Sequence, residues 1–144
     1  MIALDLFVPG VPKPKGSWRA ITSATTGKAF LVPNDKKSKP WEHVVRYDAM
    51  HAWTRPLLQG PTHVGCFFHM PRPKKHYRTG KHAKDLRDDA PVWHINTPDA
   101  DKLLRCVLDA LTGVVIRDDS IIASIQTGKT YQDTPGVRIV VEEL

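Results

Sequence analysis

The stretch that most constrains the fold runs from Thr97 to Ser120 and reads TPDADKLLRCVLDALTGVVIRDDS. Apolar residues recur in it at helical spacing, which predicts an amphipathic helix with one buried face. These residues are Leu103, Leu104, Val107, Leu108 and Leu111. Gly113 then tolerates a positive φ after the last helical turn, and Val114–Ile116 predicts a short buried β segment. The stretch therefore predicts a compact helix-turn-strand unit.

An acidic pair stands at each end of this unit, Asp99 with Asp101 before the helix and Asp118 with Asp119 after the strand. Pro98 favours an extended backbone before it, so we expect Asp99 in the loop and Asp101 at the cap or in the first turn. Two carboxylates about 4 Å apart repel by about 4 kcal/mol at an effective dielectric of about 20, so three together need a cation. If the two pairs meet in space, their oxygens suit Mg²⁺, or Mn²⁺ in its place.

Each acidic pair also has an ordinary explanation. An Asp at a helix start is commonly a cap, and Asp-Asp after a strand is commonly a solvated turn. The two pairs occur together, however, in a chain of 144 residues with 21 Lys and Arg against 15 Asp and Glu, a formal charge of +6. That charge favours a polyanionic partner, nucleic acid first, and the combination favours a metal site.

Length and motifs limit the other possibilities. We expect one domain over residues 1–144, with no membrane insertion because no long apolar run occurs. Cys66 and Cys106 form no C-x-x-C motif and are predicted to be reduced core residues, while the seven histidines lack metal-ligand spacing and are predicted on the surface or in loops. No Walker loop, G-x-S-x-G or H-E-x-x-H motif is present, so we expect no nucleotide cofactor and no serine or zinc hydrolase chemistry.

The rest of the chain predicts a two-layer α+β domain, with helices on one face of a mixed β-sheet and the order β-α-β-long loop-α-β-β. The other predicted elements are an edge strand at Ile2–Val8, a small hairpin within Ile21–Val32, a helix from Pro40 to Trp53, a central strand at His63–Met70 and a C-terminal hairpin of Ile121–Thr130 with Val137–Val141. The first helix is predicted to bury Trp41, Val44, Val45, Ala49, Ala52 and Trp53, and to turn Arg46 and Asp48 outward.

Two basic loops are candidate DNA contacts. The proline-stiffened loop 9–19 is as compatible with phosphate contacts and base stacking as with a plain soluble loop. The loop 71–97 has no stable period, and a charge run is ordinarily a solvated face. Because this one leads directly to Asp99, we favour an arm that tracks a DNA strand. The candidate contacts are Lys13, Lys15, Trp18, Arg19, Arg72, Lys74, Lys75, Arg78, Lys81 and Lys102.

The chain resembles the RusA family of Holliday-junction resolvases. The motifs that carry the resemblance are Pro98-Asp99-Ala100-Asp101-Lys102-Leu103-Leu104, Leu108-Asp109-Ala110-Leu111-Thr112-Gly113 and Arg117-Asp118-Asp119-Ser120. The resemblance implies a homodimeric, Mg²⁺-dependent endonuclease that cuts two opposed strands of a four-way DNA junction. It implies a cytoplasmic protein, in the bacterial host if phage-encoded. It also implies that the metal-binding aspartates are Asp99, Asp101 and Asp119, with Asp118 beside them.

The sequence departs from the family pattern at two positions. Lys102 stands where the family commonly has Asn, and Arg105 stands where a catalytic Lys is expected. Arg keeps its charge but cannot donate a proton near neutral pH. If the family Lys acts by stabilising charge on the phosphate, either Arg105 or Lys102 can replace it.

The predicted reaction is metal-assisted phosphodiester hydrolysis at Asp99, Asp101 and Asp119, with Arg105 neutralising charge. Asp109 is predicted either to orient Arg105 or to form an ordinary i,i+4 ion pair with it. One alternative is a non-catalytic protein that binds branched or single-stranded DNA. Another is a nuclease that prefers flaps or forks, because branch selectivity comes from dimer geometry.

Overall fold

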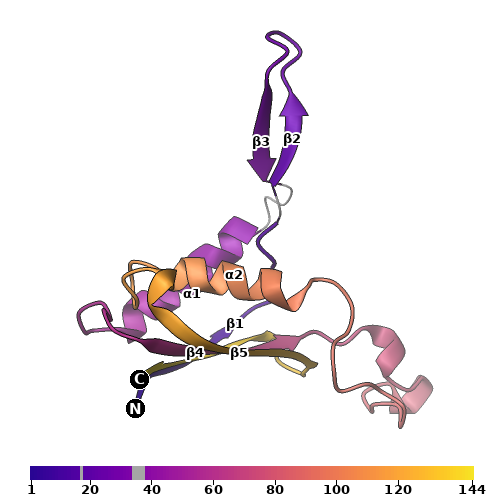
Figure 1. Ribbon diagram of the computed structural model, residues 1–144. Coiled ribbons are helices and arrows are strands. Elements are labelled where there is room, and N and C mark those ends of the chain that lie inside the picture. The colour runs from indigo at the N-terminus through magenta and orange to yellow at the C-terminus, as the bar shows by residue number, and fades with distance from the viewer. Residues whose placement is uncertain (17, 34–37) are drawn as a thin grey trace.

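The computed structural model describes residues 1–16, 18–33 and 38–144 and has two layers (Figure 1). Two helices cover one face of a four-stranded sheet of order β1-β6-β4-β5, which confirms the predicted α+β class. The elements of these layers are β1 (Ile2–Pro9), α1 (Ser38–Ala52), β4 (Thr62–Met70), α2 (Ala100–Leu111), β5 (Ile122–Tyr131) and β6 (Gly136–Glu143). The predicted edge strand β1 and central strand β4 are both confirmed.

The predicted C-terminal hairpin is wrong, because β5 and β6 lie on opposite sides of β4. Val64 of β4 lies opposite Ile125 in a parallel pairing with β5 and opposite Val141 in an antiparallel pairing with β6. The apolar composition of β4 explains this placement: Val64, Cys66 and Phe68 are at most 1% exposed. A strand this apolar is removed from water most completely when both of its edges are paired.

The parallel pairing of β4 and β5 requires a crossover connection, and α2 provides it. The helix buries Leu103, Cys106, Val107, Ala110 and Leu111, whereas the predicted Leu104 and Leu108 are half-buried. Gly113 ends the unit with φ 80°, as predicted. Val114–Ile116 forms a tight turn in place of the predicted strand; its Ile116 bridges to Leu58 and is fully buried.

Helix α1 packs on α2 and begins at Ser38, before Pro40. Trp41, Val45 and Ala49 are buried as predicted, and Trp53 is buried just beyond the helix, but Val44 and Ala52 are exposed. The outward prediction for Arg46 is wrong. Its guanidinium donates to the carbonyl oxygens of Asp109 at 2.8 Å and Thr112 at 3.2 Å. A helix leaves its last carbonyls without partners, so Arg46 caps the C-terminal end of α2.

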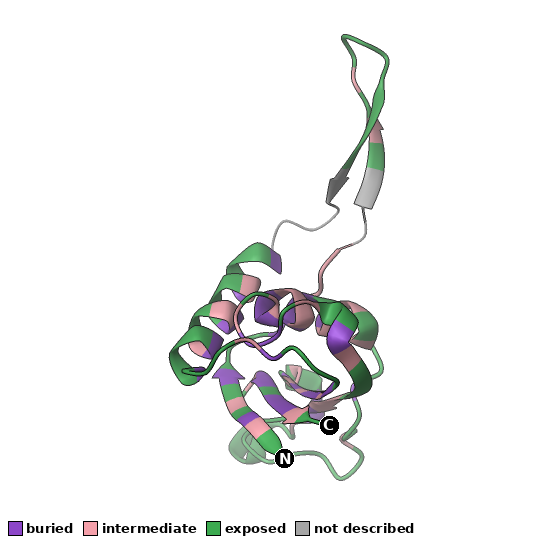
Figure 2. Ribbon diagram, turned by 60° about the vertical axis from the view of Figure 1, so that its left-hand side comes forward, coloured by how far each residue is buried: buried purple, intermediate pink, exposed green. Residues whose placement is uncertain are grey.

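The predicted small hairpin is confirmed as β2 (Trp18–Thr22) paired with β3 (Ala29–Pro33). It projects from the two layers, and most of its described residues are exposed (Figure 2). Phe30 and Leu31 are 48% and 65% exposed. Among the described residues, no helix has the length and apolar character that a membrane span needs.

Replacing Arg46 by Met should lower the free energy of unfolding by about 2 kcal/mol, because two partly buried carbonyl oxygens lose a charged donor. Urea denaturation measures the change. Arg55→Met is the matched control: Arg55 pairs with Glu143 on the surface, and exposed ion pairs contribute less than about 1 kcal/mol. Equal losses in the two variants would contradict the capping role.

Candidate active site

The first acidic pair lies at the N-terminal end of α2, as predicted. Asp99 is the residue before the helix, with φ −70° and ψ 144°, and its side chain makes no capping bond. It follows the cis peptide bond between Thr97 and Pro98. Asp101 occupies the first turn and is exposed, with no hydrogen bond or ion pair to any described residue. Both carboxylates are therefore presented to solvent at the helix start.

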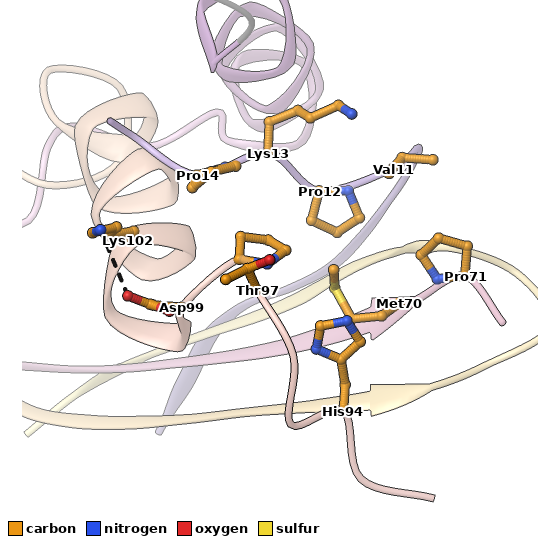
Figure 3. A pocket seen from close by; sticks show the side chains of 11 residues that line it. Val11, Pro12, Lys13, Pro14, Met70, Pro71, His94, Thr97, Asp99 and Lys102 are labelled. Atoms are coloured by element: carbon orange, nitrogen blue, oxygen red, sulfur yellow. Dashed lines mark ion pairs between the residues drawn. The ribbon is translucent and has the colours of Figure 1, made fainter. Parts of the chain in front are cut away.

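A pocket of about 500 Å³ opens beside Asp99 (Figure 3). One wall is the loop 9–19, called the proline-rich loop below. It is held to α2 because the Lys15 amide donates to the Lys102 carbonyl at 3.0 Å. The other walls are the end of β4 and the segment that precedes α2. The lining residues are Val11, Pro12, Lys13, Pro14, Met70, Pro71, His94, Thr97, Pro98, Asp99 and Lys102. Lys102 pairs with Asp99 at 3.6 Å, so the pocket combines a carboxylate with cations suited to a phosphate.

Lys129 on β5 positions the segment that carries Asp99, and sequence reasoning missed it. Its Nζ donates to the carbonyl oxygens of Asn96 at 2.5 Å and Pro98 at 2.7 Å. Its register explains this role: Lys129 lies opposite Phe68, which is buried under the helices. A lysine on the helix-facing side of a strand needs acceptors, and here they are the carbonyls just before the site.

His94 also lines this pocket; it lies in the loop 71–97, as predicted, but it is buried there. It is 9% exposed, and its Nδ1 has no hydrogen-bond partner among the described residues. Burial, together with the charge of Lys129, lowers the pKa of His94. A neutral imidazole is therefore favoured beside Asp99. His76, in the loop 71–97, is likewise buried.

The second acidic pair lies just before β5, where η3 (Asp119–Ile121) begins. Asp118 accepts from the hydroxyl of Ser120 and from its amide at 2.8 Å, and lies 3.3 Å from Arg117. These contacts, the Ser120 hydroxyl above all, lower the pKa of Asp118. Asp119 is exposed and has no side-chain partner among the described residues. Asp118 is thus held locally, while Asp119 is free to bind a ligand.

The two acidic pairs do not meet within one chain, contrary to the expectation. They stand at opposite ends of α2, whose 12 residues span about 18 Å (Figure 1). In the part of the chain that the structure describes, no three His, Cys, Asp or Glu side chains are grouped so that they could hold a metal ion. The separation follows from the topology, because a crossover helix runs the full length of the parallel strands that it connects.

Several predicted DNA contacts are engaged with other groups of the chain. Lys15 is 2.6 Å from Asp109 and 3.0 Å from Glu42, which ties the proline-rich loop to both helices. Burial lowers the pKa of Lys15, but the bonds to Asp109 and Glu42 outweigh it and raise the pKa. Asp109 therefore pairs with Lys15, and the predicted contact with Arg105 is absent from the described ion pairs. Arg105 is exposed on α2 and does not line the pocket.

The loop 71–97 folds back on itself through η1 (Lys74–His76) and η2 (Gly80–His82). Arg72 connects this loop to β5: its guanidinium donates to the Pro91 carbonyl at 2.7 Å and lies over the Tyr131 ring. Arg78 pairs with the exposed Asp88. The cations that remain exposed without an ion pair in the described part of this loop are Lys74, Lys75, Lys81 and Lys84. The side chains of Trp18 and Arg19 lie outside the described residues.

Comparison with known proteins decides the family. The profile of the endodeoxyribonuclease RusA family matches residues 9–142. The chain belongs to the RusA family. RusA membership implies a nuclease of the Holliday-junction-resolving kind that acts on branched DNA, and RusA nucleases in general depend on a divalent metal. The chain is also 25% identical to the uncharacterized protein YqaN of Bacillus subtilis (strain 168), over 100% of this chain and 99% of that protein.

The lowered pKa of His94 predicts a loss of stability in mild acid. The unfolded histidine takes up a proton below about pH 6.5, whereas the folded one resists it, so the free energy of unfolding should fall between about pH 7.5 and pH 5.5. In His94→Gln this decrease should be smaller. His76→Gln should reduce the decrease as well, since burial and Arg72 also lower the pKa of His76. Urea denaturation at both pH values measures the dependence, and an unchanged slope in both variants would contradict it.

Proposed function

We propose that this chain is a Mg²⁺-dependent endodeoxyribonuclease that resolves four-way DNA junctions as a homodimer in the cytoplasm, that of the bacterial host if phage-encoded. Mn²⁺ is expected to replace Mg²⁺. The observation that supports the proposal best is the pocket at the start of α2. Asp99 there lies among Lys13 and Lys102, at the point where the basic loop 71–97 joins the helix. Such a pocket accepts a phosphate and a hard cation together.

The proposed ligands are Asp99, Asp101 and Asp119, with Asp118 beside them. Carboxylate oxygens suit a hard divalent ion, and the described chain leaves Asp101 and Asp119 without partners. One chain alone does not fit the ion, because α2 separates the two pairs. A second copy in a two-fold dimer removes this difficulty: the start of α2 in one subunit then lies beside Asp119 of the partner subunit. Each dimer would have two such sites, one for each opposed strand of a junction.

The chain's own cations stabilise the charge of the phosphate. A divalent cation, once bound, supplies positive charge opposite the scissile phosphate and makes a water molecule more acidic. Lys102 and Lys13 line the pocket and contact the phosphate. Between the two candidates for the family lysine, we favour Lys102, because Arg105 does not line this pocket and cannot transfer a proton. Lys129 acts as a positioning residue through the Pro98 carbonyl.

Asp101→Asn and Asp119→Asn should each reduce junction cleavage by more than about 100-fold, because a carboxylate ligand is lost. Junction binding should survive or tighten as repulsion from the phosphate falls. Asp118→Asn should be milder, since Asp118 is already engaged by Ser120 and Arg117. Labelled four-way junctions measure cleavage, and mobility shifts in EDTA measure binding.

A mixture of the Asp101→Asn and Asp119→Asn subunits tests whether the site is shared. If it is shared, each mixed dimer has one intact site, in which the Asp119→Asn subunit supplies Asp101 and the Asp101→Asn subunit supplies Asp119. Nicking of one strand should then return, whereas sites within one chain would give no rescue. Calorimetric Mn²⁺ binding gives a second readout, with binding regained only in the mixture. Full activity of either variant alone would contradict the assignment of that residue.

Reversing the charge of the exposed lysines Lys74, Lys75 and Lys81 to Glu should weaken binding to duplex arms. Removing one cation that binds a DNA phosphate should lower the slope of log affinity against log salt by about 0.9. Arg55→Glu is the control and should change neither quantity, because Arg55 lies outside the loop, in the segment between α1 and β4, where it pairs with Glu143. Fluorescence anisotropy over a salt series measures both. An unchanged slope in the triple variant would mean that the loop is only solvated surface.

A panel of labelled junctions, forks, flaps and duplexes separates the proposed activity from its rivals. A resolvase cuts the four-way junction symmetrically with Mg²⁺ and prefers it over the other substrates. A binding protein without chemistry retains affinity in EDTA and nicks nothing when Mg²⁺ or Mn²⁺ is added. Preferential cleavage of forks or flaps would replace the junction assignment while leaving the nuclease assignment intact.

A further inference from the structure

The hairpin β2–β3 projects from the two layers and exposes apolar side chains (Figures 1 and 2). Among the described residues, the hydrogen bonds of 20–31 all remain within the hairpin. Phe30 and Leu31 on β3 are 48% and 65% exposed. A two-stranded hairpin that packs on nothing is only marginally stable in water. Apolar side chains exposed on such an element therefore indicate a binding surface.

The hairpin is apolar on both of its faces. Residues directly opposite each other on paired strands share a face, and successive residues point to opposite faces. Ile21 lies opposite Phe30, which makes one face apolar, and Ala20 lies opposite Leu31, which makes the other face apolar. A hairpin that docks on a flat surface needs only one apolar face. Two such faces fit a partner that covers the hairpin from both sides.

The tip of the hairpin is small enough to enter a narrow opening. Its turn contains Ala24, Thr25, Thr26 and Gly27, and Gly27 has φ 70°. The Ser23 hydroxyl oxygen accepts from the amides of Thr25 and Thr26 at 3.3 Å each, which closes the turn without a bulky side chain. Strands of five residues extend about 17 Å, so the apolar pairs behind the tip can be inserted deeply.

The charge of the surrounding sequence identifies nucleic acid as the partner. The stretch 13–39 contains the cations Lys13, Lys15, Arg19, Lys28, Lys36, Lys37 and Lys39, and its acidic residue is Asp35. Such a stretch favours a polyanion. DNA combines a charged backbone with flat apolar base faces, but in a continuous duplex those faces are covered by stacking. A branch point interrupts the stack and presents two base-pair ends that face each other.

We infer that the hairpin β2–β3 inserts into the branch point of branched DNA and covers one base-pair end with each of its faces. Ile21 and Phe30 contact one end, and Ala20 and Leu31 contact the other. Apolar side chains placed between base steps, and aromatic rings stacked on bases, are established modes of DNA binding. The inference rests on the proposed function for its substrate and adds the element that distinguishes branched from linear DNA.

The position of the hairpin links this contact to the candidate site. The proline-rich loop leads directly into β2, and its Lys13 and Pro14 line the pocket that contains Asp99. The same loop is held to α2 through the bond from the Lys15 amide to the Lys102 carbonyl. The base of the hairpin is therefore fixed beside the pocket. A DNA strand that leaves the branch point is directed towards Asp99, which places cleavage close to the branch.

Binding in EDTA tests the inference without any cleavage. The double variant Phe30→Ser with Leu31→Ser removes one large apolar side chain from each face, and should weaken binding to a four-way junction by at least about tenfold. Its affinity for linear duplex should not change. Exchange of the two residues, Phe30→Leu with Leu31→Phe, keeps both faces apolar and should retain junction binding. Fluorescence anisotropy measures the affinities. An unchanged junction affinity in the serine variant would overturn the inference.

A matched control uses exposed apolar residues of α1. Val44 and Met50 are 43% and 58% exposed there, close to the values of Phe30 and Leu31. Val44→Ser with Met50→Ser should bind junction and duplex as the wild type does. Thermal melts establish that the two layers of each variant are folded. An equal loss of junction affinity in this control would mean that the effect is not specific to the hairpin, and would also overturn the inference.

A fluorescent base tests insertion in the wild-type protein. The fluorescence of 2-aminopurine rises when the base loses stacking on its neighbours. With this base in a pair at the branch point, saturating wild type should raise the fluorescence, whereas saturating serine variant should not. With the base in the middle of an arm, neither protein should change it. The absence of a wild-type change at the branch point would contradict insertion.

Cleavage separates this inference from the proposed function. If the wild type shows the hairpin-dependent preference for junctions in EDTA but cuts nothing with Mg²⁺, the nuclease proposal fails and the inference stands. If the serine variant binds and cuts junctions as the wild type does, the hairpin does not recognise the branch and the nuclease proposal stands. The expected result is weaker junction cleavage by the serine variant at subsaturating enzyme, with wild-type cleavage by the exchange variant.

Discussion

The parallel pairing of β4 with β5 is the constraint on which the rest of the structure depends. It makes α2 a crossover helix, and a crossover helix must run antiparallel to its strands for their full length. One end of α2 then carries Asp99 and Asp101 beside the ends of the strands, and the other end leads to Asp118 and Asp119 beside their starts. The separation of the two acidic pairs is thus a property of the topology and cannot be altered by side-chain movement.

The contacts around α2 act together on the placement of its N-terminal end. Arg46 of α1 caps its C-terminal carbonyls, and Lys15 ties the proline-rich loop to Asp109 and Glu42. Lys129 fixes the preceding segment to β5 through two carbonyl oxygens. Three cations of a basic chain are thereby used to position one helix and its approach. The number of cations in a sequence therefore does not give the number of DNA contacts, because carbonyls and carboxylates within the protein need cations too.

A nuclease that must cut two opposed strands has a physical reason to share its sites between subunits. If neither subunit alone can hold the cation, an isolated chain cannot cut duplex DNA at random, and cleavage is linked to assembly of the dimer.

The sequence predicted most individual helices and strands correctly, but not which strands lie next to one another in the sheet. The helical period from Leu103 to Leu111, the positive φ of Gly113 and the apolar run of β4 are local patterns with local causes, and each was confirmed. The C-terminal hairpin was wrong because turn residues between two strands say nothing about a third strand that separates them. The burial of His94 in its loop was not predicted, because burial depends on what packs against a residue, which no local pattern states.

Residue type and spacing along the chain were enough to predict the fold class and the family motifs, and to nominate Asp99, Asp101 and Asp119 as candidate ligands. The three-dimensional structure was needed to show that Arg46, Lys15 and Arg72 bond within the chain, that His94 and Lys129 lie at the pocket region, and that the acidic pairs stand apart. These are questions of direction and distance in space. Spacing along the sequence does not answer them, because a loop of a few residues can place the next strand on either side of its neighbour.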